Sequence, residues 1–250
     1  MSYILVERKR EGVAVLTMNR PEKRNAVNQK MAEEMLAALT DLAADRSLKL
    51  LVVTGAGDRA FCAGGDLEEL HGDISGEEAF RLLSPMKDVL YALALFPLPT
   101  IALLNGDARG GGCEIATACD FRYAVPGTKA GFIQGSLGII PGWGGGVLLY
   151  RKVRPETAVR WLMEASMFDM EEAYHYGWLH KKIMVNIDRL FAPFTAKSIK
   201  QLRVLKEQYV RELGADELAE RMEAEVRTCS DVWDSKEHKE AVRRFRERKR

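Results

Sequence analysis

The feature that most constrains this 250-residue chain is a repeated pattern in which a short apolar run is followed by a glycine-rich segment. The runs at 50–54 and 100–104 are too short for helices and are bounded by turn residues, so they predict strands buried on both faces. Between them, apolar residues recur at helical spacing from Phe80 to Leu93, and Pro85 is expected to kink or restart that helix. Repeated strand and helix alternation of this kind predicts an α/β fold with parallel neighbouring strands.

The start of the chain predicts a strand pair and then a helix. Residues 4–18 alternate between apolar and polar side chains and are interrupted at Glu11-Gly12, which is typical of two strands joined by a tight turn. Asn28 is expected to cap a helix that follows it, because apolar residues recur there at helical spacing from Met31 to Leu42.

The end of the chain has a different character. Beyond Lys182 the sequence is that of charged amphipathic helices, with two apolar stripes. The stripes consist of Ile199, Leu202, Leu205 and Tyr209 in one helix and Leu218, Met222 and Val226 in another. We therefore divide the chain into a core over residues 1–184 and a helical C-terminal region over residues 185–250.

Composition excludes several classes of protein. With 47% hydrophobic residues the chain can bury one substantial core, and a net charge of +1 argues against a dedicated nucleic-acid binder. No apolar run approaches the roughly 18 residues of a membrane span, and no basic and apolar leader is present, so we expect a cytoplasmic protein with no membrane partner. The four cysteines lack the spacing of a metal site and are expected to be reduced, mostly buried thiols, with no bound metal.

Three glycine-rich segments, at 61–70, 105–115 and 138–146, are the candidates for chemistry. Glycine lets the backbone approach a ligand closely and turn its amide groups inward. Gly110, Gly111 and Gly112 precede what reads as the first turn of a helix, where free N–H groups and the helix dipole favour an anionic oxygen. A second N–H donor from the turn at 64–66 would complete a two-donor oxyanion hole.

Four segments in order, NRPEKRNAVN (19–28), FCAGGDL (61–67), NGDARGGGCE (105–114) and GIIPGWGG (138–145), resemble the crotonase (enoyl-CoA hydratase/isomerase) superfamily. The resemblance covers about residues 3–182. It implies a ClpP-like spiral of repeated β-β-α turns, an acyl-CoA thioester as substrate, and homotrimers or homohexamers. It also implies that the helical C-terminal region closes the pocket or contacts neighbouring subunits, with Phe245 of the last helix near CoA.

The resemblance assigns roles to individual residues. Gly65 and Gly111 would donate their N–H groups to the thioester carbonyl, whose oxygen becomes negative when an enolate forms. A second set would lie along the CoA moiety: Lys23, Arg24, Ala26, Ala63, Asp66 and Leu67. Asp66 would equally suit the cap of a short helix at 67–70, and Trp143 the acyl pocket or the core. CoA enters as part of the substrate, and no other cofactor is expected, because the glycine spacing is not that of a dinucleotide site.

The acid and base groups leave three functions open. Glu114 matches one of the two glutamates of the family's hydratases, but Gln134 stands where the second is expected, and an amide cannot exchange a proton at neutral pH. Hydration or double-bond isomerisation would then depend on Glu114 as proton carrier, with Gln134 positioning water. Decarboxylation of a malonyl-type CoA, such as methylmalonyl-CoA or ethylmalonyl-CoA, needs only a later protonation. A catalytically weak CoA-thioester binding protein is the third possibility.

Overall fold

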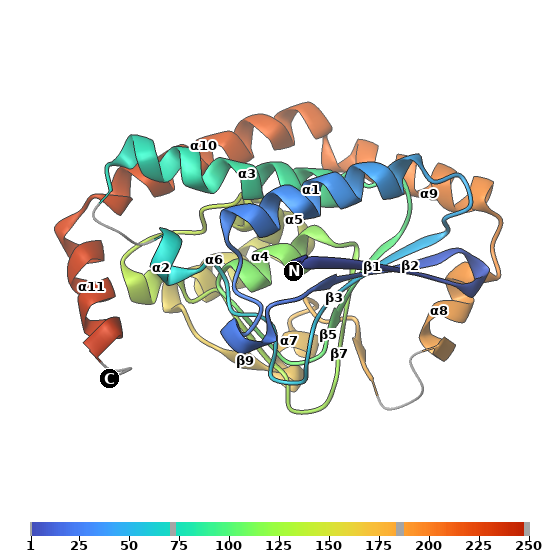
Figure 1. The fold of residues 1–250 in the computed structure, drawn as a ribbon, viewed down its shortest axis with the longest axis horizontal. Helices are drawn as coiled ribbons and strands as arrows, with labels where there is room; N and C mark the ends of the chain where they lie inside the picture. The colour runs from blue at the N-terminus through green and yellow to red at the C-terminus, as the bar shows by residue number, and fades with distance from the viewer. Residues whose placement is uncertain (1, 71–73, 184–187, 248–250) are drawn as a thin grey trace.

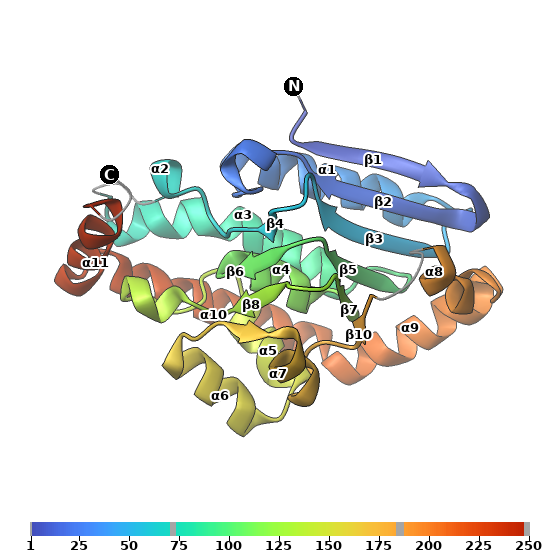
Figure 2. The same ribbon diagram turned by 90° about the horizontal axis from the view of Figure 1, so that it is seen from below.

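The computed structural model describes residues 2–70, 74–183 and 188–247. Two sheets form the centre of the molecule (Figures 1 and 2). The larger sheet has the strand order β1 (Ile4–Lys9), β2 (Val13–Met18), β3 (Leu50–Gly55), β5 (Thr100–Leu104), β7 (Phe121–Ala124) and β10 (Lys181–Lys182). The smaller sheet has the order β4 (Ala60–Cys62), β6 (Asp107–Arg109), β8 (Lys129–Gly131) and β9 (Phe168–Asp169).

Helices connect these strands and cover the sheets. Those that precede residue 180 are α1 (Gln29–Ala44), α2 (Leu67–Leu70), α3 (Gly76–Ala94), α4 (Gly111–Ala118), α5 (Gly145–Lys152), α6 (Pro155–Glu164) and α7 (Met170–His175). The C-terminal helices are α8 (Asp188–Thr195), α9 (Ile199–Leu213), α10 (Ala215–Trp233) and α11 (Lys236–Glu247).

From β3 to β8, consecutive strands alternate between the two sheets, and this alternation is the repeat of the fold. Each turn places one strand in the larger sheet and the next in the smaller sheet before the chain returns through a helix. The strand pairs are β3 and β4, β5 and β6, and β7 and β8. Neighbouring strands are parallel except in the pairs β1/β2 and β8/β9. The predicted spiral of β-β-α turns is therefore confirmed, with the strands of successive turns adding to the two sheets (Figure 2).

The N-terminal elements form as predicted. The turn between β1 and β2 passes through Glu11 and Gly12, both with left-handed φ angles of 63° and 79°. Asn28 caps α1, because its Oδ1 accepts the amide N–H of Met31 at 3.0 Å. The strand predicted at 50–54 corresponds to β3, and the side chains of Leu50 to Val53 are fully buried.

Helix α3 differs from the prediction. It runs without a break from Gly76 to Ala94, so a restart at Pro85 is wrong, and the alternative of a kink there stays a prediction. Proline removes one hydrogen bond to the carbonyl four residues earlier. That residue is Arg81, which is exposed, and water can satisfy its carbonyl. A capping box at Ser75 and Glu78 and a buried apolar face support the helix on either side of the proline.

The C-terminal region is helical as predicted, and α10 lies along α3 (Figure 1). Its stripe of Leu218, Met222 and Val226 is fully buried. The stripe on α9 is partly wrong, because Leu205 is 61% exposed and its neighbour Lys206 is buried instead. Lys206 Nζ pairs with Asp120 and donates to the carbonyl of Ala94 at 3.1 Å. Because of these partners, the buried face of α9 includes Lys206 in place of Leu205.

The expectation of reduced, mostly buried thiols is confirmed. All four cysteines are free and buried. Among the described residues, no helix is long and apolar enough to span a bilayer, and no cluster of metal-ligating side chains occurs. Residues 184–187, at the expected boundary between core and C-terminal region, lie outside the described residues, and the division at 184 and 185 stays a prediction.

Candidate active site

The glycine-rich segments meet at a cavity of about 380 Å³. One wall contains residues 63–65, a second contains Gly110, Gly111 and Glu114, and a third is the segment between Ile133 and Trp143. The C-terminal helices supply Trp233, Ala241 and Arg244. Most of the lining is apolar, which suits an acyl chain, and the polar side chains Glu114 and Gln134 lie together in it.

The amides of Gly65 and Gly111 are available for a ligand. Val27 donates to the carbonyl of Gly64 and accepts from the amide of Asp66, both at 2.8 Å, so this bridge uses the groups on either side of Gly65. Gly111 is the first residue of α4, where an amide has no partner within the helix. Neither amide donates to another group in the part of the chain that the structure describes, and both glycines line the cavity.

Close packing explains why the residue at 111 is glycine. A β-carbon on Gly111 would lie 2.1 Å from the ring of Trp143. Gly64 has a φ of +94°, and a β-carbon there would lie 3.2 Å from the amide nitrogen of Gly111, so the two glycine segments are adjacent. Trp143 is 3% exposed and also lines the cavity, which means that it serves the core and the pocket together.

Glu114 projects from the first turn of α4 and is 2% exposed. Its Oε2 accepts the amide N–H groups of Trp143 and Gly145, both at 3.0 Å, and its Oε1 accepts Nε2 of Gln134 at 2.8 Å. Burial raises the pKa of this carboxyl, and the hydrogen bonds from Gly145, Trp143 and Gln134 oppose that rise. A buried carboxyl with a raised pKa can both take up and release a proton.

Gln134 begins a 3₁₀ turn over Gln134–Leu137 and is 7% exposed. Its Nε2 is used by Glu114, and its Oε1 has no hydrogen-bond partner among the described residues. Because a buried acceptor without a partner is costly, this oxygen requires a donor from the solvent or from a ligand in the cavity.

The residues predicted to lie along CoA have mixed positions. Ala63 lines the cavity, and its amide donates to the carbonyl of Arg24 at 3.0 Å. Lys23 forms an exposed ion pair with Glu68 at 2.9 Å, which raises the pKa of the lysine through a hydrogen bond and charge attraction. The side chain of Leu67 lies outside the described residues, as does that of Phe245 in α11.

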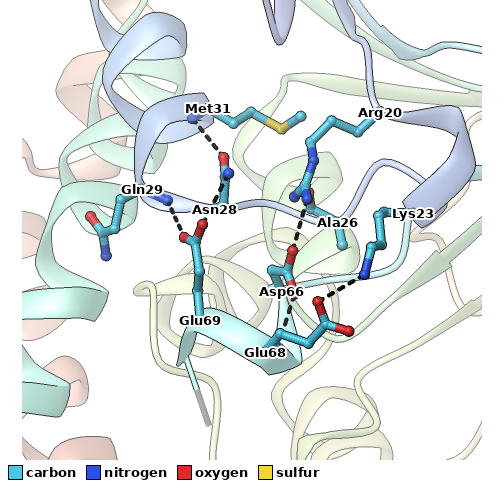
Figure 3. Close-up of polar contacts among 9 residues, drawn as sticks. All are labelled: Arg20, Lys23, Ala26, Asn28, Gln29, Met31, Asp66, Glu68 and Glu69. Carbon is cyan, nitrogen blue, oxygen red and sulfur yellow. Dashed lines mark hydrogen bonds and ion pairs between the residues drawn. The ribbon is translucent and has the colours of Figure 1, made fainter. Parts of the chain in front are cut away.

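Asp66 holds the segment around residues 20–28 in place (Figure 3). Its Oδ2 forms a buried ion pair with Arg20 at 2.9 Å, and its Oδ1 accepts the amide of Glu68 at 3.0 Å at the start of α2. The same arginine donates to the carbonyl of Ala26 at 2.8 Å. Asp66 therefore acts as a cap and an ion-pair partner, and it is absent from the described cavity lining.

Two residues near the site escaped the sequence analysis. Arg20 lies within the segment 19–28, but nothing in its spacing marks the ion pair with Asp66. Glu225, on α10, accepts the amides of Gly146 and Val147 at the start of α5. It lies beside the buried Val226 in an amphipathic helix, so its pattern is that of an ordinary surface acid.

Comparisons with known proteins identify the family of the chain. A family model described as Enoyl-CoA hydratase/isomerase matches residues 8–250. A Syntrophomonas wolfei protein named crotonyl-CoA hydratase is 38% identical over 185 residues, which cover 73% of this chain and 70% of that protein. The ethylmalonyl-CoA decarboxylase of Gallus gallus is 34% identical over 174 residues, which cover 70% of this chain and 58% of the relative.

The fold agrees as well. The crystal structure of an enoyl-CoA hydratase from Bacillus halodurans superposes with a TM-score of 0.87, covering 97% of this chain and 100% of the other, at 22% identity. At that identity the likeness concerns the fold alone.

Proposed function

Because the chain belongs to the enoyl-CoA hydratase/isomerase family, we propose that it acts on an acyl-CoA thioester and adds water to an enoyl-CoA, with Glu114 as the single proton carrier. The observation that carries this proposal is the unpartnered Oε1 of Gln134 beside the Glu114 carboxylate. Both groups accept hydrogen bonds, and both line one apolar cavity. Water is the smallest molecule that can donate to two acceptors at once.

The proposed mechanism begins with that water. One hydrogen is donated to Oε1 of Gln134 and the other to Oε1 of Glu114, so a lone pair of the water oxygen faces the substrate. Glu114 takes up the proton as the water oxygen bonds to the β-carbon of the enoyl thioester. The electron pair of the double bond moves onto the thioester oxygen, where the amides of Gly65 and Gly111 stabilise the enolate. The protonated Glu114 then returns the proton to the α-carbon.

A single glutamate suffices for this sequence because the proton that it takes from water is the one that it gives to carbon. Gln134 holds the water and keeps Glu114 oriented, and it exchanges no proton. The same shuttle without water would move a double bond, which is isomerisation. The unpartnered Oε1 of Gln134 favours hydration, because isomerisation involves no water that would donate a hydrogen bond to this oxygen.

Decarboxylation is the second candidate. The 34% identity with the chicken ethylmalonyl-CoA decarboxylase supports it, as does the neutral side chain at position 134. A second glutamate there would repel the carboxylate of a malonyl-type substrate, and Gln134 does so less. In this reaction carbon dioxide leaves, its bonding electrons form the enolate held by Gly65 and Gly111, and a proton from Glu114 completes the product.

The remaining features of the proposed function are the substrate's CoA and the assembly. Lys23 and Arg24 are basic side chains in the segment that lies against residues 63–65, which suits a phosphorylated ligand. CoA enters as part of the substrate, with no other cofactor. We propose a homotrimer or homohexamer, to which exposed apolar side chains such as Met163 and Leu205 are suited. A cytoplasmic location fits the free thiols.

A mass-spectrometric turnover assay tests the function. Crotonyl-CoA, a 3-enoyl-CoA, methylmalonyl-CoA and ethylmalonyl-CoA are each presented to the wild type and to Glu114→Gln. We expect hydration of crotonyl-CoA that the variant loses. Loss of carbon dioxide from the malonyl thioesters with crotonyl-CoA unchanged would move the assignment to decarboxylase. Return of all four substrates unchanged, with thioesters still bound, would identify a binding protein.

A further inference from the structure

Helix α5 begins in a loop of three glycines whose amides face two carboxylates. Glu225 of α10 accepts the amide of Gly146 at Oε1, at 3.1 Å, and the amide of Val147 at Oε2, at 2.8 Å. These are first-turn amides of α5, which have no partner within the helix and carry the positive end of its dipole. The α10 carboxylate therefore fixes where α5 begins.

Two other amides of the same loop donate hydrogen bonds to Glu114. Trp143 and Gly145 donate to its Oε2, so successive amides of one short segment are divided between a carboxylate in the cavity and a carboxylate behind it. Only glycine fits between them. A β-carbon on Gly145 would lie 2.3 Å from Cγ of Glu114, and one on Gly146 would lie 2.5 Å from Oε2 of Glu225.

We propose that Glu225 is a positioning residue for Glu114, because it holds the start of α5 and thereby keeps the amides of Trp143 and Gly145 aimed at the Glu114 carboxylate. This inference rests on the proposed function, in which Glu114 carries the proton. It gives the C-terminal helical region a role in the chemistry through a residue that is not part of the described cavity lining.

The charges around Glu225 are consistent with this role. Glu225 lies in a surface hollow together with Arg151 of α5 and Arg221 of α10. Both arginines form ion pairs with Glu217. On the α3 side, Lys87 pairs with Glu223. The pKa of Glu225 is raised to about 8 by burial and by the charge of Glu114, and it is lowered by the amides of residues 144, 146 and 147. The amides of Gly146 and Val147 are thus the partners that stabilise its charge.

The two ways in which Glu225 can influence Glu114 have opposite signs. The amides of Trp143 and Gly145 lower the pKa of Glu114 against burial. If Glu225 acts by holding these amides, its loss loosens them and the pKa of Glu114 rises. If Glu225 acts only as a nearby negative charge, its loss lowers the pKa of Glu114. A purely structural residue would leave that pKa unchanged.

The experiment is an infrared titration of the Glu114 carboxyl group in the full chain. The band is assigned by subtracting the spectrum of Glu114→Gln in each background, and it is followed in the wild type, Glu225→Ala, Glu225→Gln and the control Glu223→Gln. Glu223 is an acid of the same helix that bonds to Lys87. In parallel, kcat and KM for crotonyl-CoA are measured against pH.

We expect the Glu114 pKa to rise in Glu225→Ala, to rise less in Glu225→Gln, whose amide oxygen still accepts one N–H, and to stay unchanged in Glu223→Gln. The acid limb of kcat should move to higher pH by the same amount, with kcat lowered about tenfold and KM within twofold. An unchanged or lowered Glu114 pKa in both Glu225 variants would overturn the proposal. If the wild type turns over no enoyl-CoA while the titration still shifts, the proposed function fails and the positioning role stands.

Discussion

The two ends of α4 carry buried charge of opposite sign, and they serve different purposes. At its N-terminal end Glu114 is held by amide groups and lines a cavity. Beyond its C-terminal end lies a cluster that we call the α4 C-terminal cluster. It consists of Asp120, Arg122, Lys152, Lys206 and Tyr209. Both arrangements suit the helix dipole, which favours negative charge at the start of a helix and positive charge at its end.

The two ends differ in whether their buried polar groups have hydrogen-bond partners within the protein. In the C-terminal cluster Lys206 pairs with Asp120, Arg122 donates to the carbonyl of Cys119 at 2.9 Å, and Lys152 donates to the hydroxyl of Tyr209. At the N-terminal end Gln134 Oε1 has no partner within the described chain. A buried polar group that is fully bonded contributes to the fold, whereas one left open in a cavity is available for a ligand.

The largest expected effect is the loss of activity in Glu114→Gln. An amide cannot carry the proton, so the rate of crotonyl-CoA hydration should fall by about 10²- to 10⁴-fold. The melting temperature should hold or increase, because a buried group that burial disfavours in its charged form is replaced by a neutral one. Single-turnover kinetics and calorimetry measure the two quantities. A variant as active as the wild type would show that this end of α4 is structural as well.

The second effect concerns the other end. Lys206→Met should lower the free energy of unfolding by about 3–5 kcal/mol, because it leaves Asp120 buried without its ion-pair partner. The kcat of the folded fraction should stay within twofold, since no residue of the cluster is among those that line the cavity. Urea denaturation and turnover at a temperature below the transition test this. Lys200→Met, at an exposed position of the same helix, is the matched control.

Lys152 of the C-terminal cluster and Glu225, which bonds to the start of α5, should respond oppositely to pH. Burial lowers the pKa of Lys152 to about 7 from 10.5, so between these values the unfolded chain binds more protons and stability rises with pH. The pKa of Glu225 is raised to about 8 from 4.5, so between these values the folded chain binds more protons and stability falls as pH rises.

Melting temperatures recorded between pH 5 and pH 9 separate these contributions. Lys152→Met should remove part of the rise above pH 7, and Glu225→Gln should remove part of the fall below pH 8. Each change is expected to be smaller than that caused by Lys206→Met. Parallel curves for the wild type and both variants would mean that neither group changes its proton affinity on folding.

Much of the N-terminal end of α4 could be predicted from the sequence, because its determinants are local. Gly110 to Gly112 and Glu114 fall within one segment. Gln134 was found because the family resemblance implies a glutamate at its position before Pro141-Gly142. Their proximity in the structure follows from the strand alternation that brings successive glycine-rich segments together. Asp66 was ambiguous, since a helix cap and a ligand contact require the same residue type.

The C-terminal cluster and Glu225 were beyond prediction because their partners are distant in sequence. Lys206 lies beside Leu205 in an apolar stripe, and its burial is explained by Asp120, 86 positions earlier, and by the carbonyl of Ala94. Glu225 and the amide of Val147 are 78 positions apart. A helical pattern shows which face is apolar, but it does not show when a tertiary ion pair shifts that face by one residue.

The most direct measurement follows crotonyl-CoA in H₂¹⁸O by mass spectrometry with the wild type, Gln134→Glu and Gln134→Leu. We predict one ¹⁸O atom in the wild-type product, activity retained in Gln134→Glu, and a loss of about tenfold or more in Gln134→Leu, which cannot accept a hydrogen bond from water. If crotonyl-CoA is unchanged in all three while ethylmalonyl-CoA loses carbon dioxide, the water between Glu114 and Gln134 is not the reactant, and hydration is contradicted.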